Sequence, residues 1–351
     1  MYPQRSDYIL TETILIGDIY LIGVGSAVVC STLIGSARAS TRGTDNQEVP
    51  RFFYARIPTV IDMKSKPEKK LMRNTLILTL LALFVGFAEA DATRRALVFG
   101  LGKQKDTRWG RIHGDRDIPY VVNMLRAQGY TDIKTLKNEQ ATKARMVNAF
   151  RELAARCRKG DVVYIHYSGH GQLMTDLNGD EAHKWNGRHA DWDESWIPYD
   201  AYMTYCKEDR GEKHFCDDEV AEFLQRIRRK ITQSGRITVA IDACHSGDAT
   251  CGSDEECVRG VDVKFNIPKP SSPPPPAKPI KEQWQTISAC KPYQLSTEIK
   301  GKQIGKLTYA MYLLGKNTHK LSNRLLESKI AEIYEKHSGR IRQTPMVTGK
   351  R

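Results

Sequence analysis

Apolar residues along 91–351 follow two periodicities that alternate along the chain. Short apolar runs rich in β-branched residues predict strands, and the segments between them repeat apolar residues every three or four positions, which predicts helices. The predicted strands are 96–102, 133–136, two strands that begin at 161 and 236, and 285–289. The predicted helices are 115–129, 142–159, 217–230, 307–314 and 321–337, and residues 344–349 form a final strand or loop. The β-α-β-α-β order at the start predicts an α/β fold with a mostly parallel sheet covered by helices.

Two of these strands end in residues that can perform chemistry. The strand from 236 reads RITVAID and stops at the turn ACHSG around Cys244, and the strand from 161 ends in small residues around His170. Parallel strands release their carboxyl ends at one edge of the sheet, where open α/β sheets place their sites. A free cysteine is commonly a core residue, but an imidazole at the same edge would activate it as a nucleophile. We therefore predict a Cys244–His170 pair, with the backbone N–H groups of Gly171 and Cys244 as an oxyanion hole.

The composition is that of a globular protein. The 351 residues are 40% hydrophobic and 27% charged, enough for one large or two small domains. A formal net charge of +13 is compatible with nucleic-acid binding. The sequence carries no nucleic-acid recognition motif and neither a GxxxxGK[ST] nor a GxGxxG phosphate loop. We therefore predict no nucleic-acid partner.

Residues 72–90 have the features of a secretory signal peptide. A basic start at Arg73 leads into an apolar run that closes on Ala88-Glu89-Ala90, an A-x-A cleavage pattern. At about 13 apolar residues the run is short for a membrane span, which needs roughly 20; a membrane anchor is the alternative. We predict export to the periplasm or the cell exterior, with no membrane attachment after cleavage. Residues 1–71 are then a non-native or disordered N-terminal extension, in which the apolar stretch 14–34 is a candidate span if the segment is translated.

Cysteine usage fits an oxidising compartment. Setting aside Cys30 in the extension and the candidate nucleophile leaves an even number of cysteines, enough for up to three disulfides. We predict Cys206–Cys216 and Cys251–Cys257 as local pairs. Because the sequence has no CxxC pair, it gives no support to zinc.

Two segments interrupt the α/β pattern. Residues 173–215 are long and irregular, with a brief extended piece at 197–199, and a loop of this length beside catalytic strands is usually functional. Residues 248–281 include KPSSPPPPAKP, a proline run that predicts an exposed, extended linker. An SH3-type ligand is the sharper alternative for those prolines.

Four ordered motifs resemble those of metacaspases, which are caspase-like cysteine peptidases of clan CD whose bacterial members are often called orthocaspases. The motifs are YSGHGQ around His170, DACHSG around Cys244, ISACKPYQLSTE from Ile287 and GKLTYAMYLL from Gly305. The resemblance runs from about 96 to 349 and implies a caspase-haemoglobinase α/β/α sandwich. It also implies a large-subunit-like part 91–247 and a small-subunit-like part 282–351, joined by the linker 248–281. By this resemblance Cys244 is the nucleophile and His170 the general base or acid.

The same resemblance implies cleavage after Arg or Lys. Asp242 lies two residues before the nucleophile and can face a cationic P1 side chain, bidentately if it is Arg. The family's second pocket acid matches Asp117, with Asp115 as a near alternative, and Ser168 matches a serine that helps to line the pocket. A helix N-cap is the structural alternative for Asp117.

Many metacaspases are activated by calcium through aspartates, and Asp193, Asp217 and Asp218 fall at matching positions. The family's further aspartate is Cys251 here, so Asp248 or Asp254 would have to substitute. Hard oxygen ligands suit Ca²⁺, although a solvated acidic loop is the default interpretation of such a cluster. We predict Ca²⁺ as a candidate activator and no cofactor for the chemistry itself.

Taken together, the motifs predict an Arg/Lys-specific cysteine endopeptidase that acts as a monomer on proteins or peptides with basic P1 residues. Members of the family often cut themselves in the linker, where Arg259, Lys264 and Lys269 are the basic candidates. One rival is a thiol hydrolase of legumain or gingipain type, which a panel of P1 residues would distinguish. The other rival is a non-catalytic module that uses the fold for binding, and an intact Cys/His pair argues against it.

Overall fold

The computed structural model describes residues 92–181, 192–244, 257–269, 280–292, 294–337 and 339–350 in full, and the backbone alone of 14–24, 27–36 and 53–62. The chain divides into two units, Met1–Ala90 and Asp91–Arg351. The predicted signal peptide 72–90 lies outside the described residues. Among the residues that are described, no helix combines the length and apolar character that a membrane crossing needs.

The first unit contains an antiparallel sheet. Its strands are β1 (Ile14–Val24), β2 (Ala27–Ser36) and β3 (Phe53–Asp62), hydrogen-bonded in the order β1-β2-β3. The apolar stretch 14–34, a candidate span in the sequence, is divided between two of these strands. The strands are rich in Ile, Val, Thr and Tyr, which favour extended backbone. That residues 1–71 are a non-native or disordered extension stays a prediction.

A six-stranded sheet lies at the centre of the second unit, in the order β12-β11-β10-β6-β4-β5. All neighbouring strands are parallel except β11 and β12. The strands are β4 (Arg94–Gly100), β5 (Asp132–Lys137), β6 (Val162–Ser168), β10 (Arg236–Asp242), β11 (Gln285–Ser288) and β12 (Met346–Gly349). The central strands β4, β6 and β10 have no exposed residue and are mostly buried, as expected of parallel strands covered on both faces.

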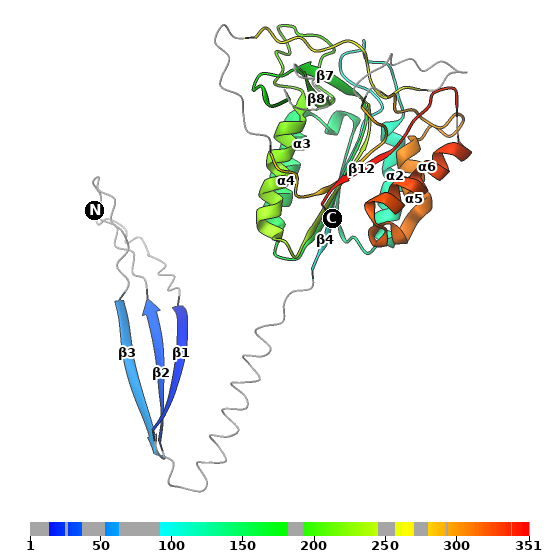
Figure 1. Cartoon of the computed structure of the whole chain (residues 1–351). Coiled ribbons are helices and arrows are strands. Elements are labelled where there is room, and N and C mark those ends of the chain that lie inside the picture. The colour runs from blue at the N-terminus through cyan, green and yellow to red at the C-terminus, as the bar shows by residue number, and fades with distance from the viewer. Residues whose placement is uncertain are drawn as a thin grey trace, which may run out of the picture. The chain divides into compact units, whose positions relative to one another are not determined.

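Helices cover both faces of this sheet (Figure 1). Helices α3 (Lys143–Arg156) and α4 (Asp217–Ile231) pack on one face, and α2 (Gly114–Ala127), α5 (Lys306–Leu314) and α6 (Asn323–Lys336) pack on the other. Each layer has its own apolar core: Phe99, Phe150 and Phe223 belong to the first, and Leu125, Leu307 and Ile330 to the second. The predicted α/β/α sandwich with a mostly parallel sheet is confirmed.

The sequence places the helices within a few residues of their observed bounds. Helix α3 begins where Thr142, its N-cap, accepts a hydrogen bond from the backbone N–H of Arg145. The turn after α2 contains Gly129 in the left-handed region, at φ 84°, which a glycine adopts without steric cost. These signals are local, so they can be recognised in the sequence alone.

The long segment 173–215 is more regular than predicted. It forms a small antiparallel sheet of β7 (Gly171–Thr175), β8 (Trp192–Trp196) and β9 (Phe215–Cys216), although residues 182–191 lie outside the described residues. Trp196 and Phe215 pack into the core below α3 and α4. That burial of two aromatic side chains holds an otherwise polar segment in place.

The start of the linker is also more ordered than predicted. Residues 257–269 are anchored by buried side chains at Val258, Val261 and Phe265, and the ring of Phe265 lies 4.1 Å from that of His214. Phe265 also pairs with β7, donating its N–H to Leu173 O at 2.8 Å. The four consecutive prolines of the run lie within 270–279, outside the described residues.

One predicted disulfide is wrong. Cys206 and Cys216 are both free, because Cys206 sits in a turn closed by backbone hydrogen bonds with Asp209 while the Cys216 thiol faces Glu219. Cys257 is disulfide-bonded, and its predicted partner Cys251 lies outside the described residues.

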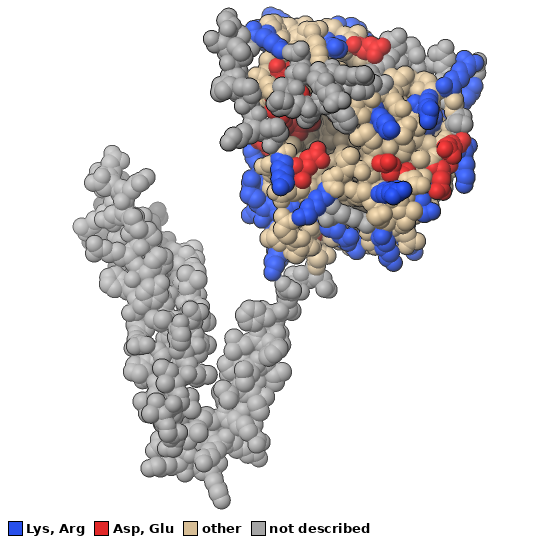
Figure 2. Space-filling model, viewed as in Figure 1, with Lys and Arg blue, Asp and Glu red and all other residues tan. Residues whose placement is uncertain are grey.

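Charged side chains are mixed on the face shown in Figure 2. Lys and Arg are scattered among Asp and Glu there rather than gathered in one continuous basic patch. The positive net charge is therefore not focused on that face, which matters because nucleic-acid binding depends on a focused field.

Candidate active site

Cys244 and His170 follow neighbouring strands that end at the same edge of the sheet. Strands β6 and β10 are parallel and hydrogen-bonded, with Ser168 opposite Asp242 at their last pair. Each candidate residue comes two positions after its strand, and the N–H of Gly169 donates to Asp242 O at 3.4 Å across the gap. The predicted adjacency of these two strands is confirmed.

The imidazole of His170 is buried and its tautomer follows from its contacts. Nε2 lies 2.6 Å from the carbonyl oxygen of Gly110, which can only accept, so Nε2 carries the proton. Nδ1 therefore holds a lone pair, and it has no hydrogen-bond partner among the described residues. Burial lowers the pKa of His170 to about 4, against the opposing effect of the Gly110 carbonyl. The ring is neutral at physiological pH, and Nδ1 is the nitrogen able to accept a proton.

Two backbone N–H groups converge on one carbonyl oxygen at this edge. The N–H of Cys244 donates to Arg259 O at 3.0 Å, and the N–H of Gly171 donates to the same oxygen at 3.3 Å. These are the two donors predicted for an oxyanion hole. A pair of fixed donors on one oxygen is the arrangement that stabilises negative charge when a nucleophile adds to a carbonyl.

Residues 257–259 lie beside the candidate nucleophile as an extended peptide. Val258 forms an antiparallel bridge with Thr297. The N–H of Arg259 donates to Ser296 O at 2.9 Å, and the N–H of Glu298 donates to Cys257 O at 2.9 Å. This is strand addition, the way in which many proteins hold an extended peptide.

The side chain of Arg259 fills a fully buried acidic pocket. Its Nη1 lies 2.6 Å from Asp117 Oδ2, 2.6 Å from Ser168 Oγ and 3.6 Å from Asp242 Oδ2. Its Nε and Nη2 donate to Glu298 Oε1 at 3.2 and 3.0 Å. The exposed fraction is 0% for Arg259, Asp117, Ser168 and Asp242. The three residues predicted to line a pocket for a basic side chain therefore surround one.

The first turn of α5 holds the two pocket aspartates. Thr308 donates to Asp242 Oδ2 through its backbone N–H and its Oγ1, both at 2.8 Å, and the N–H of Gly305 donates to Asp117 Oδ1 at 3.2 Å. The positive end of a helix dipole favours carboxylates. A Cβ on Gly305 would lie 2.1 Å from Asp242 Oδ2, so only glycine permits this approach.

The alternative roles considered for the pocket acids do not hold. The N-cap of α2 is His113, and Asp117 lies inside the helix with its carboxylate in the pocket, so Asp117 is not an N-cap. Asp115 points elsewhere, because its Oδ2 accepts a hydrogen bond from Asn138 at 3.2 Å.

The charges in the pocket are coupled. Burial opposes ionisation of Glu298, but the Arg259 guanidinium and two contacts from His113 hold the pKa of this carboxyl at about 2. Burial raises the pKa of Asp117, even though Arg259 opposes the shift. Burial would lower the pKa of Arg259, and the surrounding carboxylates raise it instead. The pocket is built around a cation, because without one it would contain several buried carboxylates of like charge.

Sequence reasoning missed the part of the pocket that comes from the C-terminal half. Ser296, Glu298, Gly305 and Thr308 all contact the pocket or the strand within it. These residues lie in the motifs ISACKPYQLSTE and GKLTYAMYLL, which resemble metacaspase motifs. The motifs indicate the family, but they do not indicate which of their residues reach the pocket.

A second acidic cluster lies where β7, β8 and α4 meet. Within it, carboxylate oxygens of Asp176, Asp180 and Asp193 lie within 4.8 Å of one another, as do those of Glu181, Asp193 and Asp217. Asp193 and Asp217 are thus brought together as predicted, whereas Asp218 accepts a hydrogen bond from Asn178 and belongs to neither group among the described residues. Asp176, Asp180, Glu181 and Asp193 are buried rather than solvated.

This cluster fits a hard divalent cation. Burial raises the pKa of Asp193 to about 9, and the charges of Asp217, Asp176, Asp218 and Glu181 add to the shift. Its Oδ1 has no hydrogen-bond partner among the described residues. Several oxygen ligands from carboxylates are the donor set that Ca²⁺ takes.

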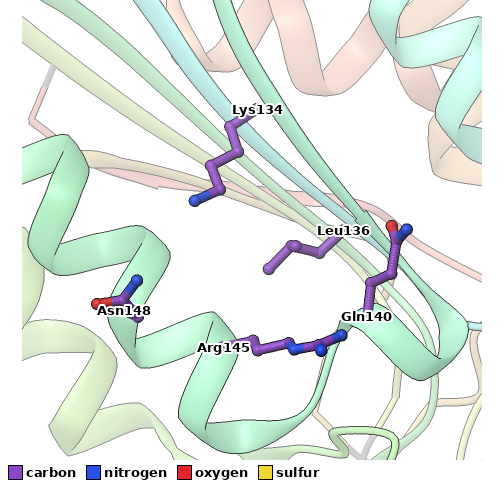
Figure 3. Close-up of a pocket in the computed structure, with 5 residues that line it drawn as sticks. All are labelled: Lys134, Leu136, Gln140, Arg145 and Asn148. Atoms are coloured by element: carbon purple, nitrogen blue, oxygen red, sulfur yellow. The ribbon is translucent and has the colours of Figure 1, made fainter.

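Two other features do not form part of the active site. A hollow of about 330 Å³ is lined by Lys134, Leu136, Gln140, Arg145 and Asn148, and we assign none of them to catalysis. Figure 3 shows these side chains between β5 and α3. His113, Cys257 and Glu298 also lie close together. Because Cys257 is disulfide-bonded, it offers no thiolate for zinc.

Part of the chain is similar to known metacaspases. Residues 116–251 match the family model described as metacaspase, peptidase C14 domain. Metacaspase-1A of Aspergillus niger is 30% identical over 172 residues, which is 46% of this chain and 38% of that protein. Metacaspase-1 of Ajellomyces capsulatus is also 30% identical over 172 residues, which is 46% of this chain and 43% of that protein. The chain thus spans about two fifths of these relatives.

A solved structure supports the fold. A protein of Geobacter sulfurreducens matches with a TM-score of 0.50 and 21% sequence identity, over 73% of this chain and 92% of that chain.

Proposed function

We propose that the protein is a cysteine endopeptidase of metacaspase type that cleaves peptide bonds after Arg or Lys, and the match of residues 116–251 to the metacaspase peptidase C14 model supports the peptidase class. The observation that supports this most directly is Arg259 in the acidic pocket. Its carbonyl oxygen accepts two N–H groups, one of them from Cys244. We expect a substrate peptide to place its basic P1 side chain in the same pocket and its P1 carbonyl oxygen on the same two N–H groups.

The chemistry uses the groups at the ends of β6 and β10. His170 Nδ1 takes the thiol proton of Cys244, and the thiolate sulfur bonds to the carbonyl carbon of P1. The N–H groups of Gly171 and Cys244 stabilise the oxygen as it becomes negative. The C–N bond then breaks, and the imidazolium gives its proton to the leaving amine. Water attacks the thioester with His170 as base, which releases the P1 carboxylate and restores the thiol.

Specificity for a basic residue follows from the charges of the pocket. Asp117 and Asp242 are both fully buried, and both contact the same Nη1 of the guanidinium. An apolar or acidic P1 side chain would leave these carboxylates without a cation, and a buried charge that lacks its opposite charge is strongly unfavourable.

We also propose that the enzyme cuts its own chain between Arg259 and Gly260. Of the three basic candidates in the linker, only Arg259 has both its side chain in the pocket and its carbonyl on the two N–H donors. The ammonium of Lys264 lies 4.3 Å from the centre of the Trp192 ring instead. The arrangement favours Arg259 as the P1 residue of self-cleavage.

Wild-type protein should yield a fragment that begins at Gly260, and Arg259→Gln should not, because Gln has no charge to pair with the pocket acids. Intact-mass analysis and N-terminal sequencing of the fragments measure this. Circular dichroism verifies that the Gln variant is folded, and Arg259→Lys is the control that keeps the charge. The same cut in Arg259→Gln, or in Cys244→Ala, would contradict self-cleavage at this bond.

Calcium is proposed as an activator bound by Asp193 and Asp217, with Asp176, Asp180 and Glu181 completing the cluster. When bound, it would neutralise the crowded carboxylates. Within the small sheet Asp193 pairs with Met174 of β7, and β7 also pairs with Phe265 of the self-cleaved segment. Strand β7 therefore lies between the acidic cluster and the segment 257–269, whose Arg259 occupies the active site.

Calcium should raise the melting temperature of the uncleaved Cys244→Ala protein by several degrees, since a ligand that binds only the folded state stabilises it. Adding Asp193→Asn should remove this response, because it takes away the carboxylate shared by both groups. Glu222→Gln, at an exposed position on α4, is the matched control and should respond like the parent. Thermal melts with calcium or with a chelator measure the shift. An equal shift with Asn at 193 would argue against this site.

We further propose that the protein is exported. The disulfide at Cys257 supports an oxidising compartment, because disulfides seldom persist in the cytosol.

A further inference from the structure

Two separate groups of residues contact the guanidinium of Arg259. Asp117 and Ser168 contact Nη1, each at 2.6 Å. On the other edge, Glu298 Oε1 accepts from Nε at 3.2 Å and from Nη2 at 3.0 Å, and no other described residue is hydrogen-bonded there. The pocket therefore has one set of partners for Nη1 and another for the edge formed by Nε and Nη2.

Glu298 is held firmly in this position. Its exposed fraction is 3%. The backbone N–H of His113 donates to Oε1 at 2.7 Å, and His113 Nδ1 lies 2.6 Å from Oε2. The backbone of Glu298 is fixed too, because its N–H donates to Cys257 O. Because both carboxylate oxygens and the backbone N–H of Glu298 are hydrogen-bonded, its side chain cannot move to contact a P1 side chain of different shape.

A P1 lysine cannot satisfy both sides of this pocket. Arginine presents a planar fork of five N–H donors, whereas lysine presents one ammonium. Lysine is one bond shorter than arginine, so its ammonium can approach Asp117 and Ser168 but supplies no Nε–H and no second terminal nitrogen to Glu298. Glu298 would stay ionised and buried without the two guanidinium N–H groups that donate to its Oε1, and losing a partner of a buried charge is costly.

We propose that Glu298, positioned by His113, is a specificity-determining residue that makes the pocket favour arginine over lysine at P1. The inference rests on the proposed peptidase function and refines its substrate class. Glu298 contacts the side chain of P1 directly, and His113 acts through Glu298 as a positioning residue.

The test compares kcat/KM for two peptide reporters that differ only in Arg or Lys at P1. Their ratio, measured on one enzyme preparation, does not depend on the fraction of active enzyme. In wild type we expect a ratio of about tenfold or more in favour of Arg, as for sites built to hydrogen-bond one substrate group. Glu298→Gln should bring the ratio towards one by slowing the Arg reporter, while the Lys reporter changes little.

Three variants sharpen this comparison. Glu298→Asp keeps the charge but withdraws it by one methylene, so its ratio should fall between those of wild type and Glu298→Gln. His113→Gln should lower the ratio in the same direction, and it decides the question if Glu298→Gln does not fold. Glu332→Gln, at an exposed position of α6, is the control and should keep the wild-type ratio.

The outcomes separate the two proposals. A wild type that cleaves both reporters equally well would overturn the role of Glu298 and leave the peptidase intact. So would an Arg preference that persists unchanged in Glu298→Gln and His113→Gln. A wild type that cleaves neither reporter would instead contradict the proposed function.

Discussion

Replacing Cys244 with Ala is expected to reduce turnover of an Arg reporter by at least about a thousandfold, the scale on which removal of a catalytic nucleophile acts. The substitution deletes one sulfur atom from a residue that is 2% exposed, so the fold should remain intact. The full-length chain should also stay uncut. Reporter turnover, together with circular dichroism of the same sample, measures both effects.

Cys290→Ala is the matched control for this prediction. Cys290 is a second buried, free cysteine in the same small cluster as Cys244 and Val258. Burial raises the pKa of the Cys290 thiol, so it stays protonated and is a poor nucleophile. Its loss should change turnover by no more than a few-fold. Turnover that survives in Cys244→Ala but disappears in Cys290→Ala would reverse the assignment of the nucleophile.

The second large effect is expected at Asp242. Asp242→Ala should lower kcat/KM for Arg and Lys reporters by about a hundredfold or more, which corresponds to the roughly 3–5 kcal/mol lost when a buried ion pair loses one partner. The carboxylate lies 3.6 Å from the nearest guanidinium nitrogen, and two hydrogen bonds from Thr308 hold its Oδ2. Steady-state kinetics on both reporters measure the loss.

Two further variants isolate the charge from the shape of the pocket. Asp242→Asn keeps the volume and should lose most of the same activity. Asp115→Asn changes a buried aspartate that is bonded to Asn138 outside the pocket, and it should leave the kinetics nearly unchanged. Equal losses at Asp115 and Asp242 would indicate general destabilisation rather than a specific pocket.

The parts of the site that could be predicted from sequence carry strong local signals. β6 and β10 are buried parallel strands with continuous apolar runs, and such strands place their carboxyl ends at a common edge. Cys244 and His170 follow directly from that rule. The positions of Asp117, Ser168 and Asp242 were inferred from the resemblance to metacaspases, and the structure brings all three to one guanidinium.

What could not be predicted depends on contacts between distant residues. Residues 257–269 look like the beginning of a proline-rich linker, and nothing local indicates that Arg259 is buried. Its burial depends on carboxylates from three separate parts of the chain, at 117, 242 and 298. Similarly, the strands β7 to β9 are short, and they persist because Trp196 and Phe215 reach the core.

The central claim is that this chain is a thiol peptidase for basic P1 residues, and a panel of peptide reporters tests it most directly. Four reporters with Arg, Lys, Asn or Asp at P1 would be incubated with wild-type protein, with calcium and with a chelator. We predict turnover of the Arg and Lys reporters, greater with calcium, and none of the Asn and Asp reporters. Turnover of the Asn or Asp reporter in preference to Arg and Lys, or no turnover of any reporter under either condition, would contradict the claim.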